Sequence, residues 1–225
     1  MIPWQLLDSA PMPGGNDELK LFRRGDDFTI RLKGLDLMTS RVHGSEETLA
    51  TMVCERVGDR ANVKVLVGGL GMGFTLAACL QQLGPDAIVE VVEIVPAVVA
   101  WNRGPLAHLS GHALKDPRTV VRQRDLASLL KSSNSVYDGI MNDVVNGPDG
   151  LLRPENRWLY SPRGLATTFR ALRPGGVLTV WSVGPDESFT ARLTDAGFKA
   201  RARRVRDSGG PKGRHHVIWV AQRPD

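Results

Sequence analysis

The sequence predicts an α/β fold with a seven-stranded, mostly parallel sheet that ends in an antiparallel strand pair, plus a small N-terminal β region. From residue 63 onward, Val- and Ile-rich runs of strand length alternate with helical patterns, as in a parallel sheet covered by helices on both faces. The last two strand patterns follow each other across a Gly- and Pro-rich segment without a helix between them, which predicts the antiparallel pair. Residues 1–57 lack the alternation and form the separate N-terminal region.

Two domains are therefore expected, a β-hairpin region with a helix at 1–57 and an α/β domain at 58–225. In the first, strands at 18–24 and 27–32 flank Gly25-Asp26, which has turn chemistry. A third strand follows at 34–38, and a helix at 45–57 has Ser45 as its expected N-cap. The later strands are expected near 63–68, 87–93, 118–123, 136–142, 176–183, 198–205 and 215–222, and the helices near 73–84, 96–108, 125–132, 161–173 and 186–196.

Composition indicates a globular protein and excludes several classes of function. Of the 225 residues, 42% are hydrophobic and 24% charged, and no apolar run approaches the roughly 20 residues of a membrane span. No secretory signal pattern opens the chain, so a cytoplasmic protein without membrane partners is expected. The two cysteines and five histidines show no metal-ligand spacing, so no metal site is expected.

The net charge of +5 is unevenly distributed. Basic residues concentrate between Lys199 and Arg214, where they alternate with apolar ones. This pattern indicates a strand with one solvated face, and it leaves nucleic-acid binding as a less favoured alternative.

The most informative segment is a glycine cluster at the end of the first strand of the large sheet. Gly69, Gly71 and Gly73 stand where a strand turns into a helix, so the backbone there can approach a ligand closely. The next strand ends in Glu93 about twenty residues later, the spacing with which a nucleotide-binding βαβ unit holds a ribose. The segment therefore predicts a nucleoside-containing cofactor.

Two further carboxylates follow neighbouring strands, and the carboxyl ends of parallel strands meet at one edge of the sheet. Asp125 follows the third strand and Asp143 the fourth. Each of these groups also has a purely structural interpretation: the glycines as a tight turn, Glu93 as a helix N-terminal acid, and the aspartates as caps. Their joint position favours a binding site.

These features resemble the class I S-adenosylmethionine-dependent methyltransferase superfamily, which has a Rossmann-like fold, across residues 60–225. By resemblance, Gly69, Gly71 and Gly73 pass under the methionine part, Glu93 binds the ribose and Asp125 contacts the adenine amine. A dinucleotide-binding loop would have glycine at position 74, where this chain has Phe74.

A narrower resemblance is to the spermidine synthase-like, polyamine aminopropyltransferase-related branch of that superfamily. It is carried by the segments VVEIVPAVV at 91–99, DPR at 116–118 and ALRPGGVL at 171–178, and by the strand-rich N-terminal region. It implies S-adenosylmethionine or its decarboxylated form as cofactor, and it makes polyamine chemistry an expectation.

The chain departs from that branch where acceptor chemistry is concerned. The aspartate of the family's glycine loop is replaced by Met72, and the second aspartate of its Asp-x-x-Asp-Pro segment by Asn146. An amide cannot accept the proton that an ammonium nucleophile loses, so Asp143 is the nearby candidate base, and Asn146 is expected to orient the acceptor.

From this departure we predict methyl transfer to a small-molecule acceptor, with Asp143 and Asn146 as catalytic residues. The alternatives are aminopropyl transfer from decarboxylated S-adenosylmethionine, nucleic-acid methylation, and a non-catalytic nucleoside-binding protein. A homodimer formed through the N-terminal region is a further expectation. The segment 149–161 is expected to form a lid that carries Trp158 and Tyr160.

Overall fold

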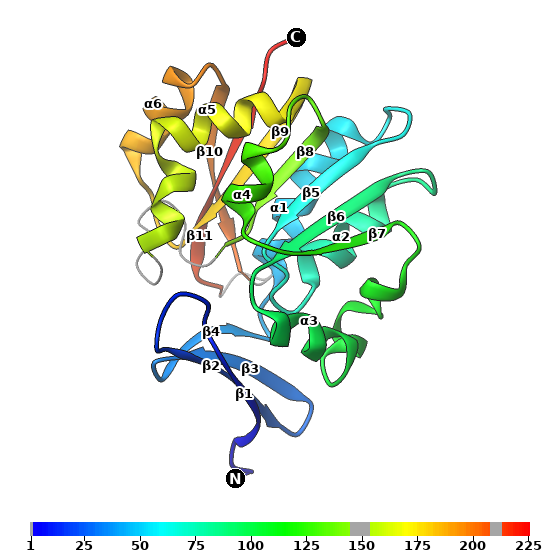
Figure 1. Ribbon diagram of the computed structural model, residues 1–225, viewed down its shortest axis with the longest axis vertical. Coiled ribbons are helices and arrows are strands. Elements are labelled where there is room, and N and C mark those ends of the chain that lie inside the picture. Colours follow the sequence, from blue (N-terminus) through cyan, green and yellow to red (C-terminus); the bar gives the residue numbers. More distant parts are fainter. Residues whose placement is uncertain (1, 145–153, 208–212) are drawn as a thin grey trace.

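The computed structural model describes residues 2–144, 154–207 and 213–225. Its large sheet has seven strands in the order β10-β11-β9-β8-β5-β6-β7. The five strands from β9 to β7 are parallel to one another. Strand β11 pairs antiparallel with β9, and β10 pairs antiparallel with β11. A separate antiparallel sheet, β1-β2-β3-β4, lies below it in Figure 1. The predicted fold class is confirmed.

The elements follow the predicted order closely. The strands are β1 (Gln5–Pro11), β2 (Glu18–Arg24), β3 (Asp27–Leu32), β4 (Leu35–Thr39), β5 (Lys64–Gly68), β6 (Ile88–Glu93), β7 (Thr119–Gln123), β8 (Tyr137–Asn142), β9 (Leu172–Ser182), β10 (Lys199–Arg206) and β11 (His215–Gln222). The helices are α1 (Gly44–Val57), α2 (Phe74–Gln82), α3 (Pro96–Arg103), α4 (Leu126–Lys131), α5 (Pro162–Ala171) and α6 (Glu187–Asp195), with 3₁₀ turns at Ala107–Ser110, Ala113–Lys115 and Pro154–Tyr160.

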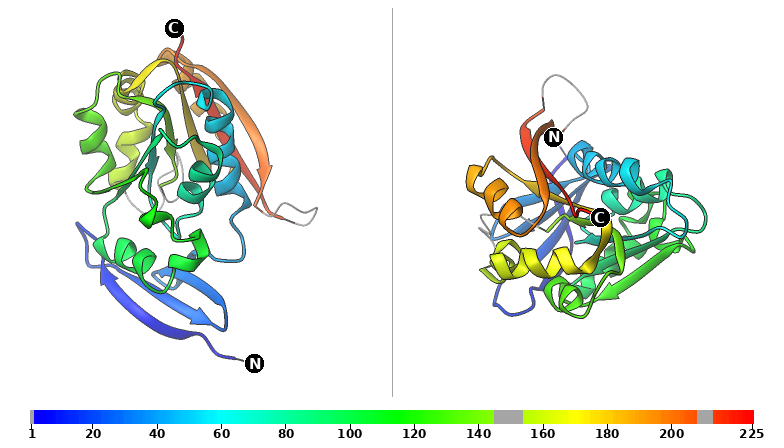
Figure 2. Two further views of the ribbon diagram at one scale, coloured as in Figure 1. Left: turned by 90° about the vertical axis from the view of Figure 1, so that its right-hand side faces the viewer. Right: turned by 90° about the horizontal axis from the view of Figure 1, so that it is seen from above.

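Helices cover both faces of the large sheet. Side chains of α1, α2 and α3 share one hydrophobic cluster with β5 and β6, and those of α4, α5 and α6 share the other with β8, β9 and β11. The central strand β8 is buried along its whole length, as its position in a two-sided parallel sheet requires. The cluster with α1 also includes Leu21 and Ile30 of the small sheet, so this sheet packs directly against the larger unit (Figure 2). The division of the chain at residue 57 stays a prediction.

Three local expectations were wrong. Strand β1 was missed, because it is an exposed edge strand in which Leu6 and Leu7 break the alternation of apolar and polar residues. Helix α3 ends at Arg103 rather than near 108, because Gly104 and Pro105 follow, and a residue before proline disfavours helical geometry.

The third wrong expectation concerns the start of α1. This helix starts at Gly44 with His43 at the N-cap and no side-chain cap. The Ser45 hydroxyl instead donates to Glu46 Oε2 at 2.6 Å.

The small sheet is attached to the large unit by a polar contact. Trp101 Nε1 of α3 donates to Asp8 Oδ2 of β1 at 2.7 Å, and the Trp101 side chain is buried. A hydrogen bond to a charged acceptor is worth about 1.5–3 kcal/mol. The contact holds β1 beside the helix that follows β6, and thus fixes the small sheet near the carboxyl edge of the large one.

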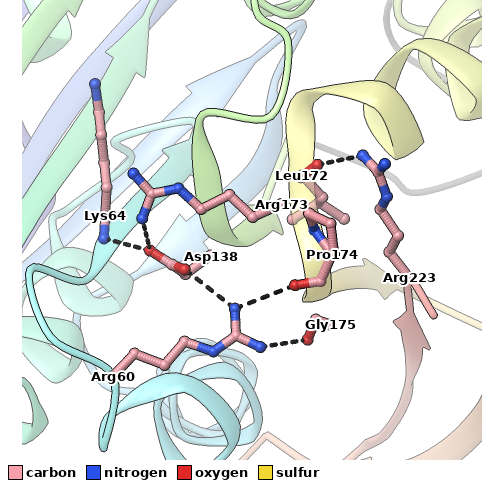
Figure 3. Close-up of polar contacts among 8 residues, drawn as sticks. All are labelled: Arg60, Lys64, Asp138, Leu172, Arg173, Pro174, Gly175 and Arg223. Carbon is pink, nitrogen blue, oxygen red and sulfur yellow. Dashed lines mark hydrogen bonds and ion pairs between the residues drawn. The ribbon is translucent and has the colours of Figure 1, made fainter. Parts of the chain in front are cut away.

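A buried ion network stabilises the end of the large sheet at which its parallel strands begin. The Asp138 carboxylate of β8 is 2% exposed and pairs with Arg60 at 3.1 Å and with Arg173 at 2.7 Å (Figure 3). It also accepts from the backbone N–H of Lys64 at 2.9 Å. Arg60 continues to the carbonyl of Gly175 at 2.9 Å. Because Arg60 precedes β5, and Asp138 and Arg173 lie at the starts of β8 and β9, the network has a structural role far from the carboxyl ends of the strands.

The basic stretch near the C-terminus forms β10, an edge strand whose arginines are exposed. Charged side chains on an edge strand oppose pairing with another chain, which agrees with the expected solvated face. Nucleic-acid binding stays a prediction. Across the described ranges, no helix is both long enough and apolar enough to span a membrane.

Candidate functional site

A cavity of ≈ 120 Å³ opens at the carboxyl ends of β5, β6 and β8, between the large sheet and the small one. Residues from both sheets line it: Met12, Leu19, Ile30, Leu37, Met38, Gly69, Gly71, Val92, Glu93, Ile94, Val95, Val98, Arg124, Asp125, Leu126, Asp143, Val144 and Asn156. Five of the predicted site residues therefore share one cavity.

At Gly69 and Gly71, the conformation of the glycine loop and its close neighbours disfavour a side chain. Gly69 has a φ of +96°, and a Cβ on it would stand 2.7 Å from the carbonyl oxygen of Asp143. Gly71 has a φ of +52°, and a Cβ there would stand 2.7 Å from Met38 Cε. Both positive φ values favour glycine, and at Gly69 the backbone carbonyl of Asp143 leaves no space for a Cβ, whereas at Gly71 the contact is with the flexible end of the Met38 side chain. The backbone of this loop is thus a wall of the cavity.

Gly73 has a different place from the one predicted. It is the N-cap of α2 with a φ of +84°, and it packs against Asn102 and Ser110 rather than lining the cavity. It serves the turn into the helix, the structural interpretation considered for this loop.

Glu93 fixes the glycine loop from the end of β6. Its carboxylate accepts from the backbone N–H of Leu70 at 3.1 Å and from that of Val95 at 2.8 Å. From α3, Asn102 Nδ2 donates to the carbonyl of Gly71 at 2.8 Å. Because Glu93 and Asn102 bind the loop backbone through these hydrogen bonds, the protein itself holds the loop in shape. The predicted contact of Glu93 with a ribose stays a prediction.

Asp125 combines a structural position with a place at the cavity. It is the N-cap of α4 and accepts from the backbone N–H of Ser128 at 2.7 Å. The same residue lines the cavity beside Arg124 and Leu126. Its predicted contact with an adenine amine is untested.

Asp143 lies at the end of β8, next to the glycine loop. Thr75 Oγ1 donates to Asp143 Oδ2 at 2.6 Å. Burial, together with the negative charge of Glu46, raises the pKa of Asp143 to about 8, and the Thr75 hydrogen bond acts in the opposite direction. A carboxylate with a pKa near the working pH is suited to accept a proton from a bound nucleophile.

The prediction of methyl transfer also depended on Met72 and Asn146. Met72, where the family has an aspartate, is 1% exposed and belongs to the hydrophobic core rather than the cavity wall. Asn146 lies outside the described residues.

The aromatic residues of the expected lid pack onto the protein instead. Tyr160 is buried, and Trp158 lies under the Lys131 ammonium at 4.4 Å. Residues 149–153 of that segment are outside the described ranges.

The contribution of the small sheet was missed by sequence reasoning. Met12, Leu19, Ile30, Leu37 and Met38 form one side of the cavity. In the sequence, they read only as apolar positions of short strands, and nothing in their spacing indicates a ligand. Sequence reasoning also missed Thr75. Its position just after the glycine loop was the signal that could have identified it as a site residue.

The chain is similar to named proteins in sequence and in fold. No family model matches the chain. The chain is 33% identical, over 178 residues, to proteins named polyamine aminopropyltransferase from two strains of Mycobacterium tuberculosis and from Mycobacterium bovis. The match covers 77% of this chain and 32% of each relative, so the chain spans about a third of the length of the curated relatives it matches.

Solved structures share the fold. A spermidine synthase in complex with the transition state analogue AdoDATO superimposes with a TM-score of 0.75 at 19% identity, covering 96% of this chain and 72% of the other. Spermidine synthase from Thermotoga maritima gives 0.74 at 18% identity with the same coverage. At these identities the likeness concerns the fold.

The preference for methyl transfer is corrected by these findings. The similar proteins described above are named polyamine aminopropyltransferase and spermidine synthase. The preference rested on Met72 and Asn146. Met72 lies in the core, so the glycine loop still lacks the family's aspartate, and it is the similar proteins that overturn the preference.

Proposed function

We propose that this chain, which is spermidine synthase-like within the class I S-adenosylmethionine-dependent methyltransferase superfamily, transfers an aminopropyl group from decarboxylated S-adenosylmethionine to an amine acceptor. The observation that carries the proposal is the position of Asp143 at the end of β8, where it lines the cavity next to the glycine loop and accepts from Thr75 at 2.6 Å. Glu93 and Asp125 bind the nucleoside part in this proposal, and Gly69 and Gly71 lie under the part derived from methionine.

The charge of the cavity supports the decarboxylated form of the donor. Among the described lining residues, the acidic side chains are Glu93, Asp125 and, at a pH above its raised pKa, Asp143, and the basic one is Arg124. Decarboxylated S-adenosylmethionine carries a sulfonium and an ammonium and has no carboxylate. Since opposite charges attract strongly in a partly desolvated site, this cavity favours the dication over S-adenosylmethionine, whose carboxylate would meet like charges.

The role of Asp143 follows from the chemistry of the reaction. The acceptor nitrogen forms a bond to the terminal carbon of the aminopropyl group while the bond between that carbon and sulfur breaks. The sulfur keeps the electron pair, so methylthioadenosine leaves as a neutral thioether. The nitrogen loses one proton, and Asp143 accepts it when ionised. Thr75 holds the carboxylate in place at 2.6 Å and orients it for this transfer.

A direct assay tests the proposal. Purified protein is incubated with decarboxylated S-adenosylmethionine and a panel of mono-, di- and polyamines, and methylthioadenosine is measured. Formation that depends on both the donor and an amine supports the proposal, and the amine that supports turnover identifies the acceptor. Tight donor binding without product from any amine would contradict it and favour the non-catalytic alternative. A homodimer stays a prediction, which the mass in solution tests.

A further inference from the structure

Met38 is the residue of the small sheet that reaches the glycine loop. It lies on β4, lines the cavity, and places its thioether over Gly71. A Cβ on Gly71 would be 2.7 Å from Met38 Cε and 3.0 Å from Met38 Sδ. The methionine therefore packs directly on the loop backbone and closes the cavity from the side opposite to β5.

The carboxylates at the two ends of the cavity define where along it Met38 contacts Gly71. Glu93 and Asp125 follow β6 and β7, and Asp143 follows β8, with the glycine loop between them. In the proposed function, on which this inference rests, the nucleoside lies at the first end and the reacting carbon near Asp143. The reacting carbon is bonded to the sulfonium, so the rest of the aminopropyl chain extends beyond it, and in this inference that part lies over Gly71, beneath Met38.

The surroundings of Met38 are unsuited to a carboxylate. Leu37, Met12 and Ile30 line the same side of the cavity, and burying a carboxylate against such groups without a partner is costly. Arg124, the basic lining residue within the described part of the chain, is directed to the Asp125 end, where its Nη2 donates to Ser128 Oγ at 3.0 Å.

We propose that Met38 determines the donor specificity of this chain, by filling the space beside Gly71 that the carboxylate of S-adenosylmethionine would need. Met38 excludes that carboxylate both by its volume and by offering no hydrogen-bond donor. The aminopropyl chain of the decarboxylated donor lacks the group and passes.

The test measures the affinities of decarboxylated S-adenosylmethionine and S-adenosylmethionine by calorimetry, and compares their ratio between variants. Met38→Ala opens the space, and Met38→Arg adds a guanidinium beside Gly71 that pairs with a carboxylate. We expect the ratio to shift toward S-adenosylmethionine by about tenfold or more in Met38→Arg, and by less in Met38→Ala. The same variants are followed by circular dichroism and thermal unfolding.

Two controls isolate the effect. Met38→Leu keeps the volume and the apolar character and should keep the wild-type ratio. Leu35→Ala alters an exposed residue of the same strand, 60% accessible and outside the cavity, and should change neither affinity. Folded Met38→Ala and Met38→Arg proteins with the wild-type ratio would refute the role of Met38 while leaving the proposed function intact. Wild-type protein that binds neither compound would refute both.

Discussion

Thr75 Oγ1 donates a 2.6 Å hydrogen bond to Asp143 Oδ2, which joins the first turn of α2 to the end of β8. Thr75 is 3% exposed, so this bond is shielded from water. It favours the ionised form of Asp143, while burial and the Glu46 carboxylate favour the protonated form. The balance of these contacts decides at which pH Asp143 can accept a proton.

The first prediction concerns the pH dependence of turnover. With a pKa of about 8 in the free protein, Asp143 is mostly protonated below that pH, so kcat/KM should rise with pH and level off above about 8. Glu46→Gln removes a negative charge and should move the rise to lower pH, whereas Thr75→Val removes a donor and should move it to higher pH. Since the acceptor amine is the same in all three proteins, its own titration cannot produce opposite shifts. Identical profiles would rule out Asp143 as the titrating group.

The second prediction is the effect of Asp143→Asn. The amide keeps the shape and cannot accept a proton, so turnover should fall by about 10²–10⁴-fold, while donor affinity changes much less. The measurement pairs an initial-rate assay with calorimetric titration of the donor. Full turnover in the variant would exclude the proposed base.

The same variant should change stability in a pH-dependent way, which is the third prediction. The pKa of Asp143 is raised on folding, so the unfolded chain loses this proton near pH 4 and the folded protein only near 8. Asp143 therefore destabilises the folded state increasingly as pH rises through that window. Asp143→Asn should raise the unfolding free energy at pH 8 by about 1 kcal/mol or more, and the gain should shrink toward pH 4. A gain independent of pH would contradict the raised pKa.

The fourth prediction uses two glycines. Gly69→Ala forces a Cβ to 2.7 Å from the carbonyl of Asp143 at a φ of +96°, and should cost about 1–3 kcal/mol of stability together with most of the donor affinity. Gly84→Ala is the matched control, because a Cβ there meets nothing within 4 Å and should change neither. Equal effects in thermal unfolding and donor titration would show that the close approach at Gly69 is not required.

The fifth prediction separates structure from function at Asp138. Asp138→Ala leaves Arg60, Arg173 and the backbone N–H of Lys64 without their carboxylate. Because both guanidinium groups stay partly exposed to water, the loss should cost about 1–3 kcal/mol of stability. The network (Figure 3) lies at the start of β8, whereas the cavity opens beyond the carboxyl end of that strand. Donor affinity of the folded variant should therefore stay at the wild-type value, as measured by calorimetry well below its unfolding temperature. A specific loss of affinity would contradict the structural role.

The sequence by itself determined the fold class and most of its elements. Periodicity together with segment length, β-branched content and flanking turn residues distinguishes strands from helices, and these signals identify even a strand such as β8, which is buried on both faces. The joint position of Gly69, Glu93, Asp125 and Asp143 at one edge also followed from the sequence, since parallel strands align their carboxyl ends. The exposed edge strand β1 was missed because solvent imposes no pattern on it.

Only the tertiary structure decided how the small sheet takes part. Met38 is separated from Gly71 by more than thirty residues, and no local pattern indicates that its thioether packs on that loop. The pKa of Asp143 likewise depends on Glu46 and Thr75, which approach it only after α1 and α2 pack against the sheet. Distances between segments far apart in the chain set both features, whereas periodicity records only which side of an element is buried.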